Sequence, residues 1–152
     1  MPKASVKRLI ECERDQLIDL VLDIEKYPEF VPFCLGSHVY EKNKEGNLTL
    51  IIADLTIGKG PFNDTYKSDV KFDKKDSSIK VTNIGGPLNY LENNWYFNES
   101  NEGTEISFDI DFEIENKFLN ILMVKSFEFG LNKIADAFQK RAEDLYRSIE
   151  EN

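Results

Sequence analysis

The chain has 152 residues and a mass of 17.6 kDa, the size of one ordinary domain with enough length to bury a core. Hydrophobic residues make up 41% of it, which excludes a disordered chain. The net charge of -9 and the pI of about 4.7 exclude a nucleic-acid binder, which needs a basic surface, and disfavour tight adsorption to anionic lipid head groups.

The N-terminus and the cysteines predict a cytoplasmic protein. Residues 1–8 are basic but contain no apolar run long enough for a signal peptide, and no stretch approaches the roughly 20 apolar residues of a membrane helix. The two cysteines, Cys12 and Cys34, are too few and too far apart for a zinc motif, so reduced thiols are the simplest interpretation. We therefore expect one domain over residues 1–152.

The first thirty residues predict a short strand and then a helix. Residues 4–11 alternate loosely between apolar and polar positions, as an edge strand does. From about Glu13 to Ile24, apolar residues recur at steps of three and four, which places them on one face of a helix. Pro28 is expected to end this helix, because the residue before a proline is pushed out of the helical region. A short turn through Pro32 follows.

The middle of the chain predicts a meander of antiparallel strands. Residues 49–57, 62–72, 79–81 and 91–97 contain alternating apolar positions, and residues that favour turns separate them. The most regular strand is 104–114, where apolar residues fall on one side and mainly acidic residues on the other. The acidic side must face water, and antiparallel sheets are the kind that can leave one face solvated.

The end of the chain predicts one long helix, with Asn116 as its N-cap and an apolar stripe that continues to Ile149. A continuous helix with a rise of 1.5 Å per residue would be roughly 50 Å long, enough to cross the sheet. Residues 118–124 are apolar nearly all round, which predicts burial, a dimer contact, a cavity entrance or transient membrane contact. Gly130 costs about 1 kcal/mol relative to alanine in a helix, so it marks either a close approach or a tolerated imperfection.

Few residues suggest catalysis. His38 is the only histidine, so neither a Ser-His-acid triad nor a transition-metal site is indicated, and residues 58–61 lack the spacing of a phosphate-binding glycine loop. Asp64 and Asn93 are polar residues on faces predicted to point inward. A buried Asp64 would be paired or have a raised pKa, and a bulge that turns it out to water is the favoured alternative. Asn93 has two interpretations, an amide for a ligand carbonyl or a bond to the backbone.

Residues 27–34, with the sequence Tyr-Pro-Glu-Phe-Val-Pro-Phe-Cys, form the most distinctive run of the chain. This run resembles the signature of the coenzyme Q-binding START-like family, part of the polyketide cyclase and lipid-transport superfamily, whose bacterial members are often named ribosome association toxin A. Two departures concern Phe33, which stands where the family usually has tryptophan, and residues 59–61, which interrupt an expected aromatic strand at the pocket rim. The resemblance covers nearly the whole chain in the same order: residues 53–58, 66–70, 86–91 with Trp95, 110–114 and 137–142.

The resemblance implies an α+β helix-grip fold, in which a curved antiparallel sheet wraps around the C-terminal helix and leaves an elongated apolar cavity. Residues 27–34 would form part of the cavity wall near its mouth, or would serve only to fix how the first helix packs on the sheet. The residues then expected to bind the ligand are Tyr27, Phe30, Val31, Pro32, Phe33, Leu55, Tyr66, Leu91, Trp95, Phe108, Phe112, Phe127, Leu131 and Phe138.

Relatives of this kind bind ubiquinone or similar polyprenyl lipids and assist quinone synthesis or its delivery to respiratory enzymes. The resemblance therefore implies a non-catalytic carrier with such a lipid as its ligand, no further cofactor, and transient contact with a membrane or a respiratory enzyme. It also implies a bacterial protein of the cytoplasm or of the periphery of the inner membrane. An apolar channel with few polar groups suits a neutral ligand, and an acidic exterior keeps such a carrier in solution.

Two other functions stay open. The name of the bacterial members implies a regulator that hinders association of ribosomal subunits. The charge of -9 argues against direct contact with rRNA, which leaves basic ribosomal proteins as its partners. The wider superfamily implies a cyclase or aromatase, in which catalysis would depend on Asp64, on tyrosines such as Tyr66 or on the shape of the pocket.

Overall fold

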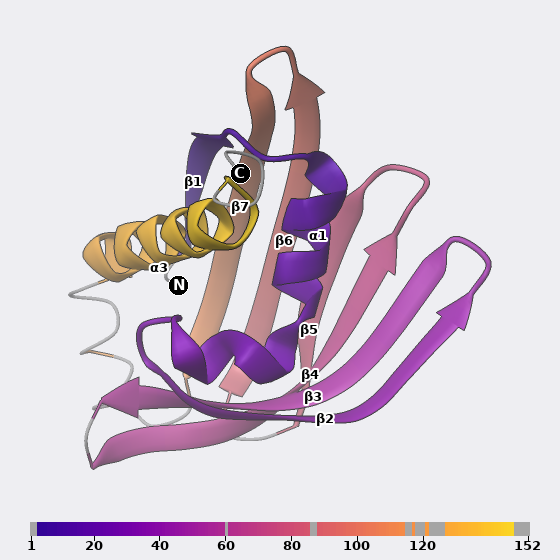
Figure 1. Ribbon diagram of the computed structural model, residues 1–152. Helices are drawn as coiled ribbons and strands as arrows, with labels where there is room; N and C mark the ends of the chain where they lie inside the picture. Colours follow the sequence, from indigo (N-terminus) through magenta and orange to yellow (C-terminus); the bar gives the residue numbers. More distant parts are fainter. Residues whose placement is uncertain are drawn as a thin grey trace.

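The alternating strands of the sequence form one strongly curved antiparallel sheet, and helices cover its inner face (Figure 1). The computed structural model describes residues 3–59, 61–85, 88–114, 117, 121 and 127–147. The sheet has seven strands in the order β1-β7-β6-β5-β4-β3-β2, which confirms the predicted α+β helix-grip fold. The strands are β1 Lys3–Ile10, β2 Cys34–Glu45, β3 Leu48–Lys59, β4 Phe62–Asp73, β5 Ser78–Gly85, β6 Leu88–Ser100 and β7 Gly103–Ile114.

The strongest strand prediction, for residues 104–114, is confirmed by β7. Ile106, Phe108 and Phe112 are buried on the inner face, whereas Glu105 and Asp109 between them are partly exposed. The edge-strand prediction is confirmed as well, because β1 pairs only with β7 and places Val6 opposite Phe108. The first and last strands of the chain are therefore neighbours at one edge of the sheet.

The first helix is shorter than the sequence predicts. α1 spans Arg14–Leu22, and the backbone N–H of Glu13 donates to the Gln16 side chain 3.1 Å away at its start. The α-helix ends before Asp23, whose ψ of 65° leaves the helical region. A separate 3₁₀ helix, η1 (Ile24–Glu29), follows and contains Pro28. Pro28 therefore lies inside a second helical segment and does not end the first helix, since the break had already occurred at Asp23.

Strand β2 is a long edge strand that the hydrophobic pattern does not reveal. Ten of its residues pair with β3, although the register shifts twice along the pair. Its outer half alternates charged and polar side chains that are all exposed, so no apolar face marks it as a strand. Charges on an edge strand also oppose pairing with another chain.

The C-terminal helix is described in part. α3 spans Phe127–Ala142 and continues as a π-helical turn, η2 (Glu143–Arg147), so the α-helical spacing expected up to Ile149 changes after Ala142. The proposed cap at Asn116 and Ile149 itself lie outside the described residues, as does the apolar segment 118–124 except for Ile121, which is helical and exposed. None of the described helices is long and apolar enough to cross a membrane.

The inner face of the sheet is packed closely at the end where α1 and β1 meet it, with a gap of about 10 Å³ beside Ile10 and Ile106. We call this region the packed end and define it by Ile10, Leu17, Ile18, Phe97 and Ile106, each at most 5% exposed. The hydroxyl of Thr104 is also buried there and donates to the Cys12 carbonyl 2.9 Å away. Burial of apolar surface at about 25 cal/mol per Å² makes this region the main source of stability.

Candidate ligand-binding cavity

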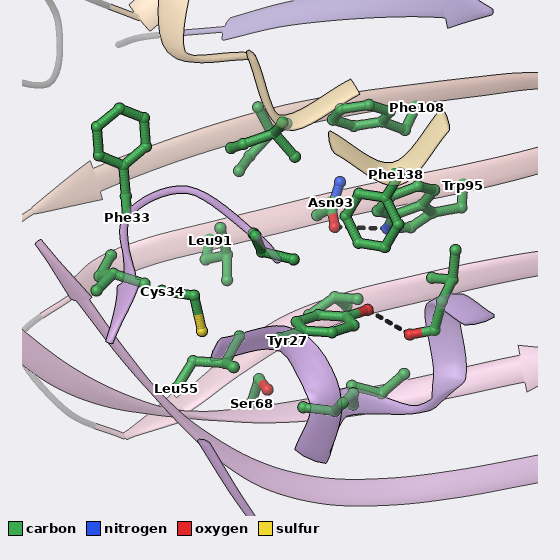
Figure 2. Close-up of a pocket in the computed structure, with 18 of the residues that line it drawn as sticks. Tyr27, Phe33, Cys34, Leu55, Ser68, Leu91, Asn93, Trp95, Phe108 and Phe138 are labelled. Carbon is green, nitrogen blue, oxygen red and sulfur yellow. Dashed lines mark hydrogen bonds between the residues drawn. The ribbon is translucent and has the colours of Figure 1, made fainter. Parts of the chain in front are cut away.

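A cavity of about 180 Å³ lies between the other end of the inner face and the segments that cover it (Figure 2). Strands β3 to β7 line one side with aliphatic and aromatic side chains. α1, η1, the loop that follows η1, and α3 line the other side. An engineered apolar cavity of about 150 Å³ holds benzene, so this one is large enough for a substituted ring.

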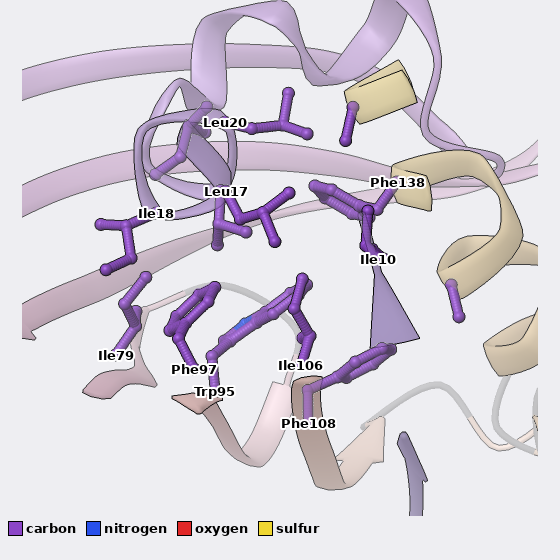
Figure 3. Packing of buried hydrophobic residues seen from close by; sticks show 14 of the residues in the cluster. Ile10, Leu17, Ile18, Leu20, Ile79, Trp95, Phe97, Ile106, Phe108 and Phe138 are labelled. Carbon is purple, nitrogen blue, oxygen red and sulfur yellow. The ribbon is translucent and has the colours of Figure 1, made fainter. Parts of the chain in front are cut away.

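An aromatic cluster separates the cavity from the packed end. The rings of Trp95 and Phe108 stack with centroids 4.5 Å apart, and Phe138 of α3 meets Trp95 edge-on at 5.2 Å. All three residues line the cavity and also belong to the packed core, where Figure 3 shows Phe97 and Ile106 beside them. This cluster keeps the cavity from extending through the whole interior.

The loop after η1 brings an aromatic side chain against the C-terminal helix. Phe33 lines the cavity and has a positive φ of 69°, which is rare for a bulky residue, and its carbonyl accepts a hydrogen bond from Gly58 N–H at 2.9 Å. A Cβ built on Gly130 of α3 would lie 3.4 Å from the Phe33 ring. Gly130 is therefore a close approach of α3 to this aromatic wall.

Five polar side chains of the cavity wall are already bonded within the protein. The hydroxyl of Tyr27 donates to the Val21 carbonyl, which ties η1 back to α1 (Figure 2). The Cys34 thiol donates to the Gly36 carbonyl 3.6 Å away, and three side chains of β4 and β6 are bonded in the same manner. Ser68 Oγ donates to the Ala53 carbonyl at 3.2 Å, Asn93 Nδ2 to the Asp109 carbonyl at 2.7 Å, and Trp95 Nε1 to Asn93 Oδ1 at 2.8 Å.

Asn93 therefore points inward, as its register with Trp95 predicts, and its amide is used for internal bonds to the backbone and to the indole. Of the two interpretations of Asn93, the structure shows the bond to the backbone. The side chain of Asp64 lies outside the described residues, so its orientation stays a prediction.

Tyr66 differs from these groups. Its side chain is 9% exposed and lines the cavity, yet its hydroxyl makes no hydrogen bond with any described residue and is not closed off by protein atoms. Burial raises the pKa of Tyr66 well above its ordinary value of 10, and the nearby Cys34 raises it further. Burial raises the pKa of Tyr27 and of Cys34 as well, so all three groups are neutral at physiological pH.

Most residues predicted to bind the ligand lie around this cavity. The structure gives their positions relative to the cavity, and their contact with a ligand stays a prediction. Eleven of the fourteen line it: Tyr27, Val31, Pro32, Phe33, Leu55, Tyr66, Leu91, Trp95, Phe108, Leu131 and Phe138.

The other three do not line the cavity in the described structure. Phe30 packs edge-on against Tyr27 and Phe138, with the Arg141 guanidinium 5.0 Å from its ring, because the turn of η1 directs it to the outer side. Phe112 is buried behind the wall against Tyr66 and Leu91. The side chain of Phe127 lies outside the described residues.

Sequence reasoning missed several wall residues. Val21 and Ile24 belong to the apolar helical face that the periodicity identifies, and Val81 and Ile110 to the inward faces of predicted strands, so the signal for each was present. The periodicity identifies the inward face of each element but not the part of that face that lines a cavity.

The single histidine does not line the cavity. His38 is exposed on β2 and stands edge-on to the Tyr40 ring, with centroids 4.5 Å apart. Among the described residues, no group of His, Cys, Asp or Glu side chains could hold a metal ion.

A curved antiparallel sheet that grips helices around an apolar cavity defines a helix-grip, START-like protein. The chain belongs to the polyketide cyclase/dehydrase and lipid transport family, whose model matches residues 10–139. The solution structure of an 18 kDa protein from Caulobacter crescentus has the same fold, with a TM-score of 0.79 and 27% identity over 95% of this chain and 98% of that one.

Two similar proteins have names that describe different functions. The chain is 29% identical to the ribosome association toxin RatA of Rickettsia prowazekii, over 92% of this chain and 95% of that protein. It is 30% identical to the mitochondrial coenzyme Q-binding protein COQ10 of Dictyostelium discoideum, over 88% of this chain and 65% of that protein.

Proposed function

We propose that this protein is a non-catalytic carrier of ubiquinone or a related polyprenyl lipid, which supports quinone synthesis or respiratory electron transport. The observation that carries the proposal is the cavity of about 180 Å³, whose wall is formed almost entirely by apolar and aromatic side chains. The name of the coenzyme Q-binding relative supports the same ligand class. The site of action we propose is the bacterial cytoplasm and the surface of the inner membrane.

The size of the cavity limits how such a ligand is held. A space of about 180 Å³ accepts a substituted ring, whereas a polyprenyl tail of many isoprene units needs far more room. We therefore propose that the ring lies inside and that the tail leaves past Pro32 and Phe33, which are among the partly exposed residues of the cavity wall. Contact with a membrane or a respiratory enzyme would then occur where the tail emerges.

The chemistry of the cavity favours binding over turnover. The described wall residues that are able to exchange a proton are Tyr27, Cys34 and Tyr66, and each has a raised pKa. A general acid or base works best with a pKa near the operating pH, and these groups are far above it. The raised pKa values of these side chains therefore disfavour the cyclase or aromatase alternative.

Extraction of the gently purified protein with organic solvent, followed by mass spectrometry, tests the carrier function. The expected result is a co-purified quinone or other polyprenyl lipid in the native protein. Ile110→Phe is the matched variant, because it adds a ring at a wall position and should reduce the recovered lipid at least about tenfold. Recovery of no lipid, together with no uptake of added quinone, would show that the carrier proposal is wrong.

The RatA relatives favour a second candidate, a regulator that hinders association of ribosomal subunits. The net charge of -9 directs this candidate toward basic ribosomal proteins and away from rRNA. Sedimentation with ribosomal subunits at physiological salt tests it, and protein that stays at the top of the gradient contradicts it. The Ile110→Phe variant separates the two functions, since a surface that contacts the ribosome should not depend on a filled cavity.

A further inference from the structure

Among the described residues of the cavity wall, one hydroxyl has no hydrogen-bond partner and is available to a ligand. The hydroxyls of Tyr27 and Ser68 and the amide of Asn93 are each bonded to a backbone carbonyl, and the indole of Trp95 is bonded to Asn93. The hydroxyl of Tyr66 has no partner among the described residues, although its side chain is 9% exposed. A hydroxyl that faces an apolar cavity without a protein partner marks a place where a bound group can complete the bonding.

The Tyr66 hydroxyl is also held in a fixed position. Its ring packs against Leu91 and Phe112 on one side and is opposite Leu55 in the β3–β4 register. A donor fixed by packed neighbours loses little freedom when it binds, so it discriminates well between ligands.

Water is a poor partner for this hydroxyl. A buried water molecule is stable when it makes two to four hydrogen bonds, and the other polar groups of the wall already have partners. A single oxygen acceptor carried by an apolar ligand matches this unpaired hydroxyl better.

The charge of the wall restricts the ligand further. None of the described residues that line the cavity is lysine, arginine or histidine. A carboxylate or a phosphate brought into such a place would lose its hydration without gaining a cation, which is strongly unfavourable. Fatty acids and phospholipid head groups therefore fit this wall poorly.

We infer that the Tyr66 hydroxyl is the specificity-determining donor of the cavity, and that the ligand is a neutral, mostly apolar molecule whose buried end carries a carbonyl or ether oxygen. This inference rests on the proposed carrier function and adds the chemical class of the ligand and the residue that recognises it. Quinone rings with carbonyl or methoxy oxygens belong to this class.

Equilibrium binding of three probes of similar length to the full chain tests the inference. The probes are decylubiquinone, decylbenzene without any oxygen, and laurate with a carboxylate. Trp95 is the only tryptophan and lines the cavity, so its fluorescence reports the quinone directly, and the other probes are measured by competition. The variants are Tyr66→Phe and the control Tyr40→Phe, which removes an exposed hydroxyl bonded to Asp54.

We expect Tyr66→Phe to weaken decylubiquinone by about 3- to 10-fold, the value of one hydrogen bond, and to leave decylbenzene unchanged. Tyr40→Phe should change neither affinity, and native protein should bind laurate more weakly than decylubiquinone at neutral pH. Equal quinone affinity of native protein and Tyr66→Phe would overturn the role of Tyr66, and tighter binding of laurate would overturn the ligand class. A native protein that binds none of the probes would instead overturn the carrier function itself.

Discussion

The inner face of the sheet has two ends that share residue types but differ in how they are filled. At the packed end, Ile106 is 5% exposed and lies among side chains of α1 and β1. Four residues further along the same strand and on the same face, Ile110 lines a cavity of about 180 Å³. The Trp95, Phe108 and Phe138 cluster lies between them.

The polar groups at the two ends differ in the same manner. At the packed end, the buried hydroxyl of Thr104 is bonded to the Cys12 carbonyl. At the cavity, the hydroxyl of Tyr66, which faces the cavity, has no partner among the described residues. The packed end therefore contributes mainly to stability, whereas the cavity end keeps apolar surface and a hydroxyl available to a ligand.

The largest effect expected from this difference concerns leucine truncation. Leu17 is 1% exposed and fully surrounded, so Leu17→Ala should lower the free energy of unfolding by about 3 to 5 kcal/mol. Leu55 already faces empty space, so Leu55→Ala should cost about half as much or less. Urea denaturation of both variants measures the two losses, and equal losses would mean that the two ends do not differ in packing.

A smaller change in stability is expected when an isoleucine is replaced by phenylalanine. Its sign should differ between the two ends. Ile106→Phe overfills the packed end and should destabilise the protein by about 1 to 3 kcal/mol. Ile110→Phe makes the same change on the same face but fills the cavity, so it should be neutral or stabilise by up to about 1 kcal/mol. Thermal unfolding without ligand measures both variants, and destabilisation by Ile110→Phe as large as by Ile106→Phe would contradict the comparison.

Removal of a hydroxyl should have a still smaller effect. Thr104→Val removes the buried bond to the Cys12 carbonyl and should cost about 1 kcal/mol. Tyr66→Phe removes a hydroxyl that has no partner among the described residues, so the unliganded protein should keep its stability to within about 0.5 kcal/mol. Chemical denaturation distinguishes the two, and a loss from Tyr66→Phe as large as from Thr104→Val would reveal a bond of Tyr66 within the protein.

The smallest effect concerns the surface ion pair that ties η1 to α3 over the cavity end. Arg141 donates a 2.9 Å hydrogen bond to Glu29, and this bond lowers the pKa of Glu29 below its ordinary value of 4.5. Because the folded-state pKa is the lower one, the stabilisation is complete above pH 4.5 and is lost as the pH falls through the folded-state pKa.

Native protein should therefore lose slightly more stability than Glu29→Gln when the pH is lowered from 6 to 3. The control is Glu25→Gln, which removes another exposed carboxylate of the same 3₁₀ helix. Thermal unfolding over this pH range measures the difference, and identical pH profiles of the native protein and Glu29→Gln would show that the pair contributes nothing.

The spacing of apolar residues predicted most of the strands and the faces that point inward. The alternation over 104–114 and the helical spacing from Leu17 to Val21 depend only on local geometry, so each residue was placed on the correct side. The run at residues 27–34 was also informative, because its side chains reach the cavity wall at five positions. Local pattern failed for β2, whose exposed charges hide it, and for the break at Asp23, which no proline marks.

Which inward residues meet a neighbour and which face the cavity depends on contacts between segments that are distant in the sequence. Ile106 and Ile110 look alike in the sequence, and so do the hydroxyls of Tyr27 and Tyr66. Ile106 is packed in the core, and the Tyr27 hydroxyl is bonded to the Val21 carbonyl of α1. Ile110 and Tyr66 instead face the cavity. Periodicity reports the direction of a side chain, whereas the partner it meets depends on how α1, η1 and α3 come together over the sheet.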